Sequence, residues 1–495
     1  MVMETTKVAV DYFESFRKNI VGHDLRFNTP YGAQNMIYAD WIASGRLYKP
    51  IEEKMLRDFG PLVGNTHTET NITGTSMTLA YKEAKHIIRQ HVHATDNDVL
   101  LMVGSGMTGA LAKLQRLLGL KVPEWLQPLP QMPESLRPVV FITHMEHHSN
   151  QIAWEESIAT VEIIQPDKDG LVDLGSLDFL LEKYRDRKFK FASVTSCSNV
   201  TGIFSPYFEI AERMHRSGGS CFVDFACSAP YAEINMHPEN PLQKLDAIFF
   251  SPHKFLGGPG SPGVLIFDAQ FYQNKVPDQP GGGTVTWTNP WGEHHYLPSI
   301  EEREDGGTPA FLQTIRAALA IKLKEQMGVQ QIMQREEEMV KKVFYALKQI
   351  QGLHILASDV AKRVGVISFY IDGLHYNLGV KLLNDRFGIQ VRGGCSCAGT
   401  YGHYLLHVSP DYSHRITEKI DQGDFSEKPG WIRLSLHPVM REEEVDHIIF
   451  AIESLAKNFV AWSADYDYNV HTNEFHYRDE DPEKHRGEIV ALFDL

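Results

Sequence analysis

An alternation of short apolar runs with helical segments occupies the middle of the chain and restricts the folds available to it. Runs with the length and composition of buried strands occur at residues 98–103, 139–142, 159–164, 190–195, 220–223, 245–250 and 263–267. Segments with helical character lie before or between them, at 76–91, 111–118, 174–185 and 206–217. This order predicts an α/β fold in which a mostly parallel sheet is covered by helices on both faces.

Five chemically different polar residues follow predicted strands at once or after a few residues: Thr108, His147, Asn199, Asp224 and Lys254. In open α/β sheets the ligand lies outside the carboxyl ends of the strands. We therefore expect these side chains to gather at one edge of the sheet and to form the functional site.

Lys254 lies in a glycine- and proline-rich turn, residues 251–260, between two of the predicted core strands. A lysine held there has its ammonium group near the interior, where loss of hydration lowers the pKa and leaves a free amine that can act as a nucleophile. The alternative is a surface hairpin with a solvated lysine, and the turn alone does not decide between the two.

A second glycine-rich turn, residues 104–110, joins the first predicted strand to a helix. Free N–H groups of the first helical turn, glycines that admit a ligand to the backbone, and hydroxyl groups together form an anion site. The turn is neither a dinucleotide fingerprint nor a P-loop, so we expect a phosphate monoester. An ordinary strand-to-helix turn is the alternative.

The composition limits the compartment and the partners. The chain has 495 residues, is 43% hydrophobic and carries a net charge of −15, so we expect a soluble globular protein that binds neither nucleic acid nor a membrane. No signal peptide is expected at the N-terminus. The five cysteines, at 197, 221, 227, 395 and 397, favour reduced thiols in the cytoplasm, and their spacing indicates no metal site.

We expect four segments along the chain. They are an N-terminal arm with a short helix near 8–20 (1–34), a large ligand-binding domain (35–325), a smaller domain (326–460) and an acidic C-terminal extension of undecided order (461–495). Helices at 310–326 and 331–350 would link the two domains.

A lysine, an aspartate, a histidine that can stack on a ring and a phosphate-binding turn are together what pyridoxal 5′-phosphate (PLP) requires. The amine of Lys254 would hold the cofactor covalently, and Asp224 would keep its pyridine nitrogen protonated. His147 could lie over the ring, while the glycine-rich turn would hold the phosphate.

With these residues in view, the chain resembles the class V aminotransferases of PLP fold type I. Within that group it is most similar to cysteine desulfurases and selenocysteine lyases of the second type, from about Tyr38 to about Ser454. The resemblance implies a seven-stranded, mostly parallel sheet in the large domain and a smaller α+β C-terminal domain.

The resemblance also implies roles for individual residues. Cofactor contacts would come from Ser105, Gly106, Met107, Thr108, His147, Asn199, Asp224, Ser251, His253 and Lys254. Substrate contacts would come from Ser44, Asn199 and Arg433, the last as a clamp on the substrate carboxylate. Thr308 matches a threonine that reaches the phosphate in the partner subunit, which implies a homodimer.

Residues 391–398 match the catalytic-cysteine motif of the family. By its position relative to Arg392, Cys397 is the matching residue and Cys395 is an additional one. The attacking group must be a thiolate, so its pKa should lie below the ordinary value of about 8.5 or a proton acceptor should lie nearby. Two structural cysteines in a glycine-rich turn are the alternative.

Two departures from the family pattern bear on the activity. Cys227 stands where the family usually has a glutamine that bonds the cofactor's ring oxygen, and residues 399–430 differ from the corresponding loop of the desulfurases. Both changes leave cofactor binding as expected but affect the choice of reaction.

The sequence thus predicts a PLP enzyme in which Lys254, His147 and Cys397 are catalytic and the C–S or C–Se bond of an amino acid is cleaved through a persulfide on Cys397. The sulfur would then pass to an acceptor protein. Another class V reaction, such as transamination, epimerisation or C–S lysis without a persulfide, is one alternative. A non-catalytic scaffold that binds PLP or another phosphorylated ligand is a second.

Overall fold

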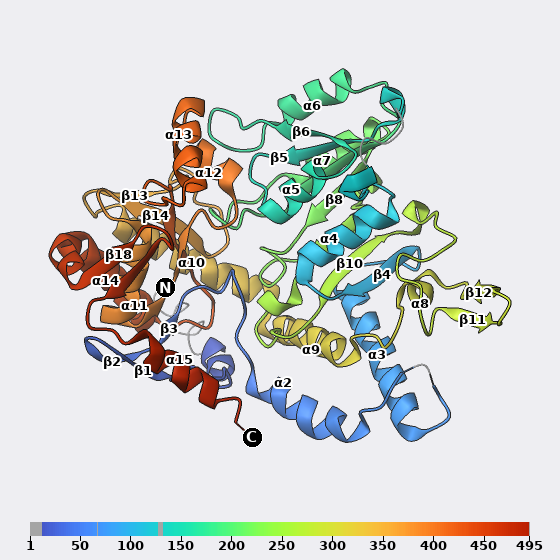
Figure 1. Cartoon of the computed structure of the whole chain (residues 1–495), viewed down its shortest axis with the longest axis horizontal. Helices are drawn as coiled ribbons and strands as arrows, with labels where there is room; N and C mark the ends of the chain where they lie inside the picture. The colour runs from blue at the N-terminus through green and yellow to red at the C-terminus, as the bar shows by residue number, and fades with distance from the viewer. Residues whose placement is uncertain (1–11, 67, 127–131, 495) are drawn as a thin grey trace.

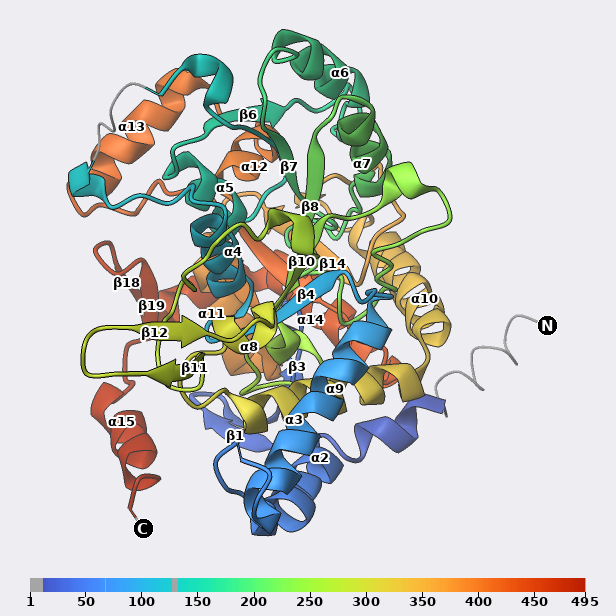
Figure 2. The same ribbon diagram turned by 90° about the vertical axis from the view of Figure 1, so that its right-hand side faces the viewer.

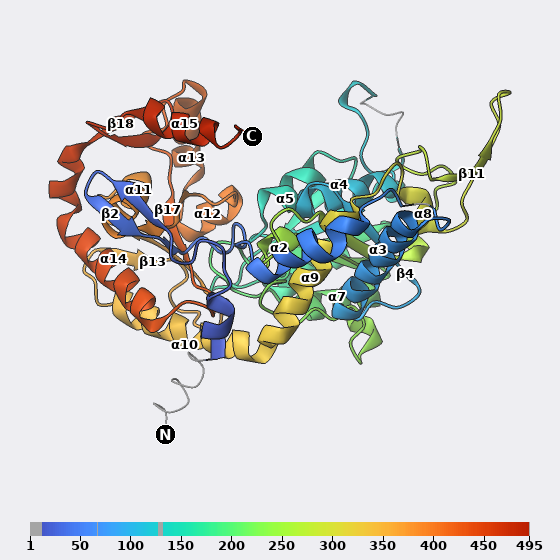
Figure 3. The ribbon, with the colours of Figure 1, turned by 90° about the horizontal axis from the view of Figure 1, so that it is seen from below.

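The computed structural model describes residues 12–66, 68–126 and 132–494. These residues form two lobes, which Figure 1 shows face-on and Figure 3 shows side by side from below. Two consecutive long helices, α9 (Phe311–Met327) and α10 (Val329–Leu347), run from the larger lobe into the smaller one. The predicted division of the chain at residue 325 stays a prediction, but it falls close to the junction of these helices.

A seven-stranded sheet forms the centre of the larger lobe, in the order β4-β10-β9-β8-β7-β5-β6. Only β10 runs against its neighbours, since it pairs antiparallel with both β4 and β9. The α/β class and the mostly parallel sheet are therefore confirmed. The strands are β4 (Asp98–Val103), β5 (Val139–Thr143), β6 (Thr160–Ile164), β7 (Lys190–Thr195), β8 (Ser220–Asp224), β9 (Ala247–Phe250) and β10 (Gly263–Asp268).

Helices cover both faces of this sheet, which is why strands such as β7 and β9 are buried along their whole length. One face packs against α4 (Gly106–Leu117) and α5 (His148–Glu155). The other packs against α6 (Leu174–Lys183), α7 (Tyr207–Arg216) and α9. The loops at the carboxyl ends of the parallel strands are left to line the space between the lobes.

The smaller lobe has its own apolar core around a four-stranded antiparallel sheet in the order β13-β14-β17-β16. The strands are β13 (Leu353–Ile355), β14 (Val366–Ile371), β16 (Arg392–Gly394) and β17 (Trp431–Ser435). Helix α10 packs against it with α11 (Tyr376–Phe387) and α14 (Glu442–Trp462). The N-terminal hairpin β1 (Arg26–Thr29) and β2 (Gly32–Asn35) and the pair β3 (Ile37–Tyr38) and β15 (Ile389–Gln390) also join this lobe.

The remaining elements lie around the two lobes. They are α2 (Lys49–Lys54), α3 (Ile72–His91), α8 (Ile300–Glu304), α12 (Gly399–Leu405), α13 (Pro410–Asp421), α15 (Pro482–Ala491), β11 (Val285–Thr288), β12 (His294–Tyr296), β18 (Tyr466–Asn469) and β19 (Glu474–Tyr477). Figure 2 shows the β11–β12 hairpin and α15 projecting from the body of the molecule. Among the described helices, none combines the length and the apolarity needed to cross a bilayer.

Several boundaries differ from those that the sequence predicts. Helix α3 begins at Ile72 rather than at residue 76, because the Asn71 side chain caps it by accepting a hydrogen bond from Gly74 N at 2.8 Å. Helix α4 begins at Gly106 rather than at residue 111, so the glycine-rich turn is itself the first helical turn. The predicted N-terminal helix near 8–20 lies partly outside the described residues; a helix spans 12–17.

The C-terminal segment, for which the sequence left the order open, has regular structure. Helix α14 continues to Trp462, and the β18–β19 hairpin and α15 follow it. Tyr466, at the start of the hairpin, is only 5% exposed and belongs to the core of the smaller lobe. The aromatic residues of this segment therefore bury part of it despite its acidic composition.

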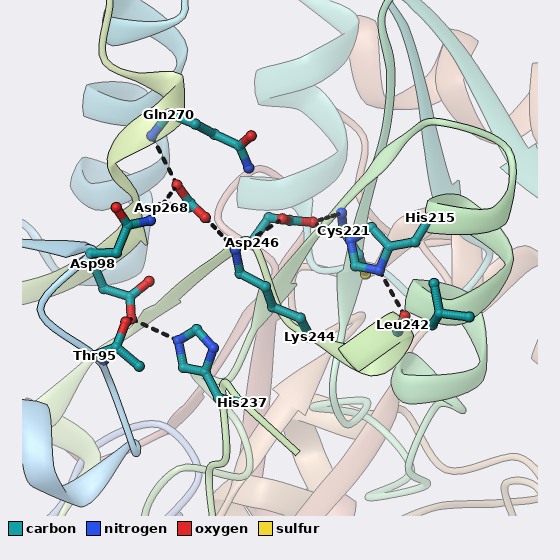
Figure 4. A network of polar contacts seen from close by, with 11 residues as sticks. Thr95, Asp98, His215, Cys221, His237, Leu242, Lys244, Asp246, Asp268 and Gln270 are labelled. Carbon is teal, nitrogen blue, oxygen red and sulfur yellow. Dashed lines mark hydrogen bonds and ion pairs between the residues drawn. The ribbon is translucent and has the colours of Figure 1, made fainter. Parts of the chain in front are cut away.

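Three buried carboxylates tie together the edge of the sheet opposite the carboxyl ends of its parallel strands (Figure 4). Asp98 accepts from His237 Nε2 at 2.7 Å, and Asp246 accepts from His215 Nε2 at 2.7 Å and from Cys221 N at 2.8 Å. Asp268 contacts Lys244 and accepts from Gln270 N at 2.8 Å. These contacts hold together the polar ends of β4, β9 and β10 at the border of the apolar core.

The His215–Asp246 pair makes stability depend on pH. The hydrogen bond that His215 donates to Asp246 raises the pKa of the imidazole above its ordinary 6.5. The stabilisation from the charged imidazole is therefore complete below 6.5 and is lost as the pH rises through the raised pKa. We expect His215→Ala to lower the free energy of unfolding by about 1–3 kcal/mol at pH 6 and by less at pH 8. Urea unfolding at both pH values measures this difference.

Arg216→Ala is the matched control. Arg216 lies on the same helix, but its side chain is exposed and, within the described part of the chain, pairs with Glu212 alone. Its loss should therefore cost well under about 1 kcal/mol. An equal loss for His215→Ala at pH 6 and pH 8 would show that the charge of the imidazole plays no part.

Candidate active site

A cavity of about 710 Å³ lies between the two lobes, at the carboxyl ends of the parallel strands. Both lobes contribute to its wall, since Asp224 ends β8 of the larger sheet and Arg433 lies on β17 of the smaller one. The structure brings nearly all the predicted site residues to this one cavity: Ser105, Gly106, Met107, Thr108, His147, Asn199, Asp224, Ser251, His253, Lys254, Cys397 and Arg433.

Lys254 stands on the short helical turn Pro252–Lys254 that directly follows β9. Burial lowers the pKa of its amine, against the opposing influence of the Cys227 thiol and the Asp224 carboxyl group. The structure gives its Nζ no hydrogen bond or ion pair with any described residue. Lys254 is therefore a deep lysine whose amine is free to react with a ligand in the cavity.

Asp224 lies at the end of β8, where its Oδ1 accepts a hydrogen bond from Ala226 N at 2.8 Å. Burial raises the pKa of this carboxyl group to about 6. A cationic or protonated nitrogen in the cavity would offset that desolvation, as a pyridinium nitrogen does. The geometry thus fits the predicted role of Asp224.

His147 caps helix α5, and its Nδ1 accepts a hydrogen bond from Ser149 N at 3.0 Å. Burial, and next the charge of Lys254, lower the pKa of the imidazole to about 4, so the ring is neutral at physiological pH. Because Nδ1 is an acceptor, the proton of the neutral ring resides on Nε2. This hydrogen bond fixes the orientation of the imidazole ring in the cavity wall.

The preceding residue, Glu146, holds this loop in place and was missed by the sequence analysis. Its carboxyl group is buried and accepts from Thr143 N, Thr143 Oγ1, Thr195 N and Asn150 Nδ2 at 2.6–3.1 Å. It thereby ties the ends of β5 and β7 to the start of α5. In the sequence, Glu146 is simply an acidic residue directly before His147, and nothing there indicates which groups it would bond.

The glycine-rich turn at the start of α4 has the form of an anion cradle. Gly106 has φ +61°, and a Cβ on it would lie 2.8 Å from Ser251 Oγ. A Cβ on Gly263 would lie 2.1 Å from the carbonyl oxygen of Gly106, so both positions require glycine. Ser251 Oγ accepts from Met107 N at 2.8 Å, and Thr108 Oγ1 contacts Ser149 Oγ at 2.7 Å. Hydroxyls and helix N–H groups therefore converge here, as a phosphate monoester requires.

The cysteine-bearing loop follows β16 and enters the same cavity. Ser396 and Cys397 both adopt left-handed backbone, with φ of 52° and 56°, which is unusual for non-glycine residues. Two hydrogen bonds from the larger lobe hold the loop: Asn199 Nδ2 donates to Ser396 O and His148 N donates to Cys397 O, both at 2.7 Å. Cys397 is exposed and Cys395 is half-buried.

Arg433 is buried on β17 and is held by a carboxylate that the sequence analysis did not assign. Asp40 Oδ1 accepts from Arg433 Nη2 at 2.8 Å, and Asp40 Oδ2 accepts from Arg392 Nε at 3.1 Å. One carboxylate thus fixes two guanidinium groups of the cavity wall. Arg433 Nε is buried and has no partner in the described part of the chain.

Three predicted positions need separate comment. Ser44 does not line the cavity, and its hydroxyl donates to Gly45 O at 3.1 Å; the preceding residue, Ala43, lines the cavity. Thr308 is exposed, outside the cavity, and donates to Asn65 Oδ1 at 3.3 Å. Cys227 lines the cavity floor, and its Sγ lies 3.6 Å from that of Cys197.

Four residues of the cavity wall carry a buried polar atom without a partner among the described residues: Asn199 Oδ1, Ser261 Oγ, Ser396 Oγ and Arg433 Nε. Unpaired buried polar groups are costly, so they indicate a polar ligand that completes their hydrogen bonds. Together with the glycine cradle, the deep lysine and the buried aspartate, they fit a phosphorylated pyridine aldehyde with an amino-acid substrate beside it.

Comparisons with known proteins agree with this geometry. Residues 37–448 match the family described as Aminotransferase class-V. The chain is 28% identical to the probable cysteine desulfurase of Halalkalibacterium halodurans over 73% of this chain and 84% of that one. It is 25% identical to the probable cysteine desulfurase of Pyrococcus abyssi, over 88% and 98% of the two chains.

Solved structures share the fold. The apo cysteine desulfurase of Thermococcus onnurineus superposes with a TM-score of 0.70 at 24% identity, covering 90% of this chain and 98% of that one. A cysteine desulfurase of Escherichia coli superposes with a TM-score of 0.66 at 20% identity, covering 85% and 94%. The similarity therefore extends over both lobes and the cavity between them.

Proposed function

The chain belongs to the class-V aminotransferase family, and from that premise we propose that it is a PLP-dependent cysteine desulfurase. The observation that carries the proposal is that the thiol-bearing loop and the free amine of Lys254 line one cavity. An aminotransferase needs the lysine alone, whereas sulfur removal also needs a nucleophilic thiol beside the substrate. Selenocysteine, whose side chain is similar, is a second substrate that the same site would accept.

Each part of the cavity has a task in this proposal. Bound PLP would supply an electron sink for negative charge that develops at the substrate α-carbon. The cradle at Gly106 would hold the phosphate, Asp224 would keep a proton on the ring nitrogen, and His147 would cover the ring. Arg433 would bind the substrate carboxylate through its guanidinium group, which Asp40 already orients.

Two groups of the chain would move protons and sulfur. The amine of Lys254 would take the proton from the substrate α-carbon, as a general base with a lowered pKa. The Cys397 thiolate would attack the substrate sulfur, so that the bond between sulfur and the β-carbon breaks. Cys397 would then carry the sulfur as a persulfide, and the carbon skeleton would leave as alanine.

The products test this assignment. Purified protein loaded with PLP and given L-cysteine with a thiol reductant should release alanine and sulfide in equal amounts. Chromatography of the amino acids and a colorimetric sulfide assay measure both. Pyruvate with ammonia would instead indicate C–S lysis without a persulfide, a keto acid without sulfide would indicate transamination, and a D-amino acid would indicate epimerisation; each of these rejects the proposal.

We also propose a homodimer in the cytoplasm that passes sulfur to an acceptor protein. The dimer is supported by exposed Thr308 and by Trp287 and Trp291, which are 50% and 83% exposed on the projecting β11–β12 hairpin. Five free cysteines favour a reducing compartment, and the exposed position of Cys397 suits sulfur transfer. Sedimentation equilibrium should give about twice the chain mass of 56.1 kDa, and the mass of a single chain would exclude the dimer.

A further inference from the structure

The C-terminal hairpin, β18 with β19, lies beyond the residues that match the family, yet its tip lines the cavity. The family match ends at residue 448, whereas the hairpin spans 466–477. Asn473, in the turn between the strands, is one of the cavity residues, together with Tyr376 and Cys395. The extension thus contributes to the site that the family residues build.

The hairpin is firmly attached to the smaller lobe. At its base, the buried Tyr466 donates its hydroxyl to Asp385 Oδ2 at 2.8 Å. At its tip, Phe425 N donates to Val470 O at 3.1 Å, which joins the tip to the segment that also brings Lys428 to the cavity. Figure 3 shows β18 at the outer edge of this lobe beside α15, and β19 packs against α11. The tip is therefore held at a fixed position in the wall.

Asn473 connects the hairpin to Tyr376 through a directional chain of hydrogen bonds. Its left-handed backbone, φ 60°, turns the side chain inward, and its backbone oxygen accepts from Asn377 Nδ2 at 2.5 Å. The Tyr468 hydroxyl donates to Asn473 Oδ1 at 2.9 Å, and Asn473 Nδ2 donates to the Tyr376 hydroxyl oxygen at 2.7 Å. The Tyr376 hydrogen therefore has no acceptor among the described residues and is left for a ligand.

The ring of Tyr376 lies directly against the backbone that leads into the cysteine loop. A Cβ on Gly430 would lie 2.6 Å from Tyr376 Cε1, and a Cβ on Gly393 would lie 3.1 Å from Cδ2. Glycine at these two positions lets the strands β16 and β17 close on the ring. Burial raises the pKa of Tyr376 above its ordinary 10 although the hydrogen bond from Asn473 lowers it, so its hydroxyl keeps the proton.

We propose that the C-terminal hairpin is part of the active site and that Asn473 positions the Tyr376 hydroxyl to donate a hydrogen bond to a sulfur anion at the cysteine end of the cavity. The inference rests on the proposed function, which places a thiolate and then a persulfide there. A hydrogen bond to the charged form stabilises it and lowers the pKa of the thiol. Asn473 and Tyr468 act only through Tyr376 and are positioning residues.

Two nearly isosteric substitutions in the full-length, PLP-loaded protein test this proposal. Tyr376→Phe removes the donor and keeps the ring. Asn473→Asp keeps the acceptor for Tyr468 but replaces the donor Nδ2 by an oxygen, to which the Tyr376 hydroxyl would donate instead. Both variants should raise by about one unit the apparent pKa at which iodoacetamide alkylates the cysteine loop. Mass spectrometry of the peptide that contains Cys395 and Cys397 measures the alkylation between pH 5 and pH 10.

Thr472→Ala is the matched control, since Thr472 lies in the same turn but is exposed and does not line the cavity. It should titrate as the unchanged protein does. Unaltered alkylation in Tyr376→Phe would overturn the proposal. If that variant fails to fold, Asn473→Leu, which removes Nδ2 without adding a charge, decides in its place. Alkylation needs no turnover, so a failed desulfurase assay with a shifted titration would reject the proposed function and leave the hydrogen-bond donor standing.

Discussion

Replacing Cys397 by alanine should abolish the release of sulfide from L-cysteine and leave the absorbance band of bound PLP in place. The nucleophile is lost, while the residues that would hold the cofactor lie in the other lobe, after β4, β5, β8 and β9. Removing a catalytic nucleophile lowers turnover by about 10³-fold or more. A sulfide assay and an absorbance spectrum of the same preparation measure both effects.

Cys395→Ala is the matched control for that experiment, because Cys395 lies two residues earlier in the same loop and lines the same cavity. Its variant should retain most of the turnover. The left-handed backbone at Cys397 and the hydrogen bond from His148 N to Cys397 O hold the second thiol, not the first, in a special conformation. Loss of turnover in the Cys395 variant alone would assign the nucleophile to Cys395.

The larger lobe could be predicted from the sequence because each of its strands is built around a short apolar stretch. Strand β9 is apolar throughout and only Ser193 interrupts the centre of β7, so the polar residues that cluster after both strands stand out. That is how Asn199 and Lys254 could be placed at the cavity before the fold was known. The reversed direction of β10 could not be predicted, since an apolar run carries no sign of its direction.

Residues that act on other functional residues were not predictable in the same way. Asp40 orients Arg433 across 393 positions of sequence, and Glu146 joins strands whose pairing is set by the fold. A single carboxylate shows no pattern in a sequence, and its partners are defined only in three dimensions. Ser44 is the opposite case. It was predicted to contact the substrate, but its hydroxyl donates to the backbone oxygen of the neighbouring Gly45.

The C-terminal extension was hidden by its composition. Its charged residues indicate a solvated segment, but the aromatic residues alternate along both strands: Tyr466 and Tyr468 on β18, Phe475 and Tyr477 on β19. That alternation is typical of a hairpin with one packed face. This alternation is present in the sequence, but the acidic residues around it concealed it, and with it the position of Asn473 at the cavity.

Replacing Lys254 by alanine should reduce turnover of L-cysteine by about 10³-fold or more, since the residue would serve both as the covalent anchor of the cofactor and as the base. PLP should still bind, more weakly, because the phosphate cradle, Asp224 and His147 lie on other segments of the wall. Borohydride reduction followed by mass spectrometry should find the cofactor fixed to Lys254 in the unchanged protein and to no residue in the variant.

Lys324→Ala serves as the matched control, because Lys324 is also buried and burial lowers its pKa to about 7, but it donates to Ala229 O and Ala232 O rather than lining the cavity. Its loss should reduce stability and leave the borohydride product on Lys254. If the cofactor were instead fixed to Lys324, or if turnover persisted without Lys254, the cavity would not be the catalytic site. What distinguishes the two lysines is that the amine of one is satisfied by carbonyl oxygens and that of the other is free to react.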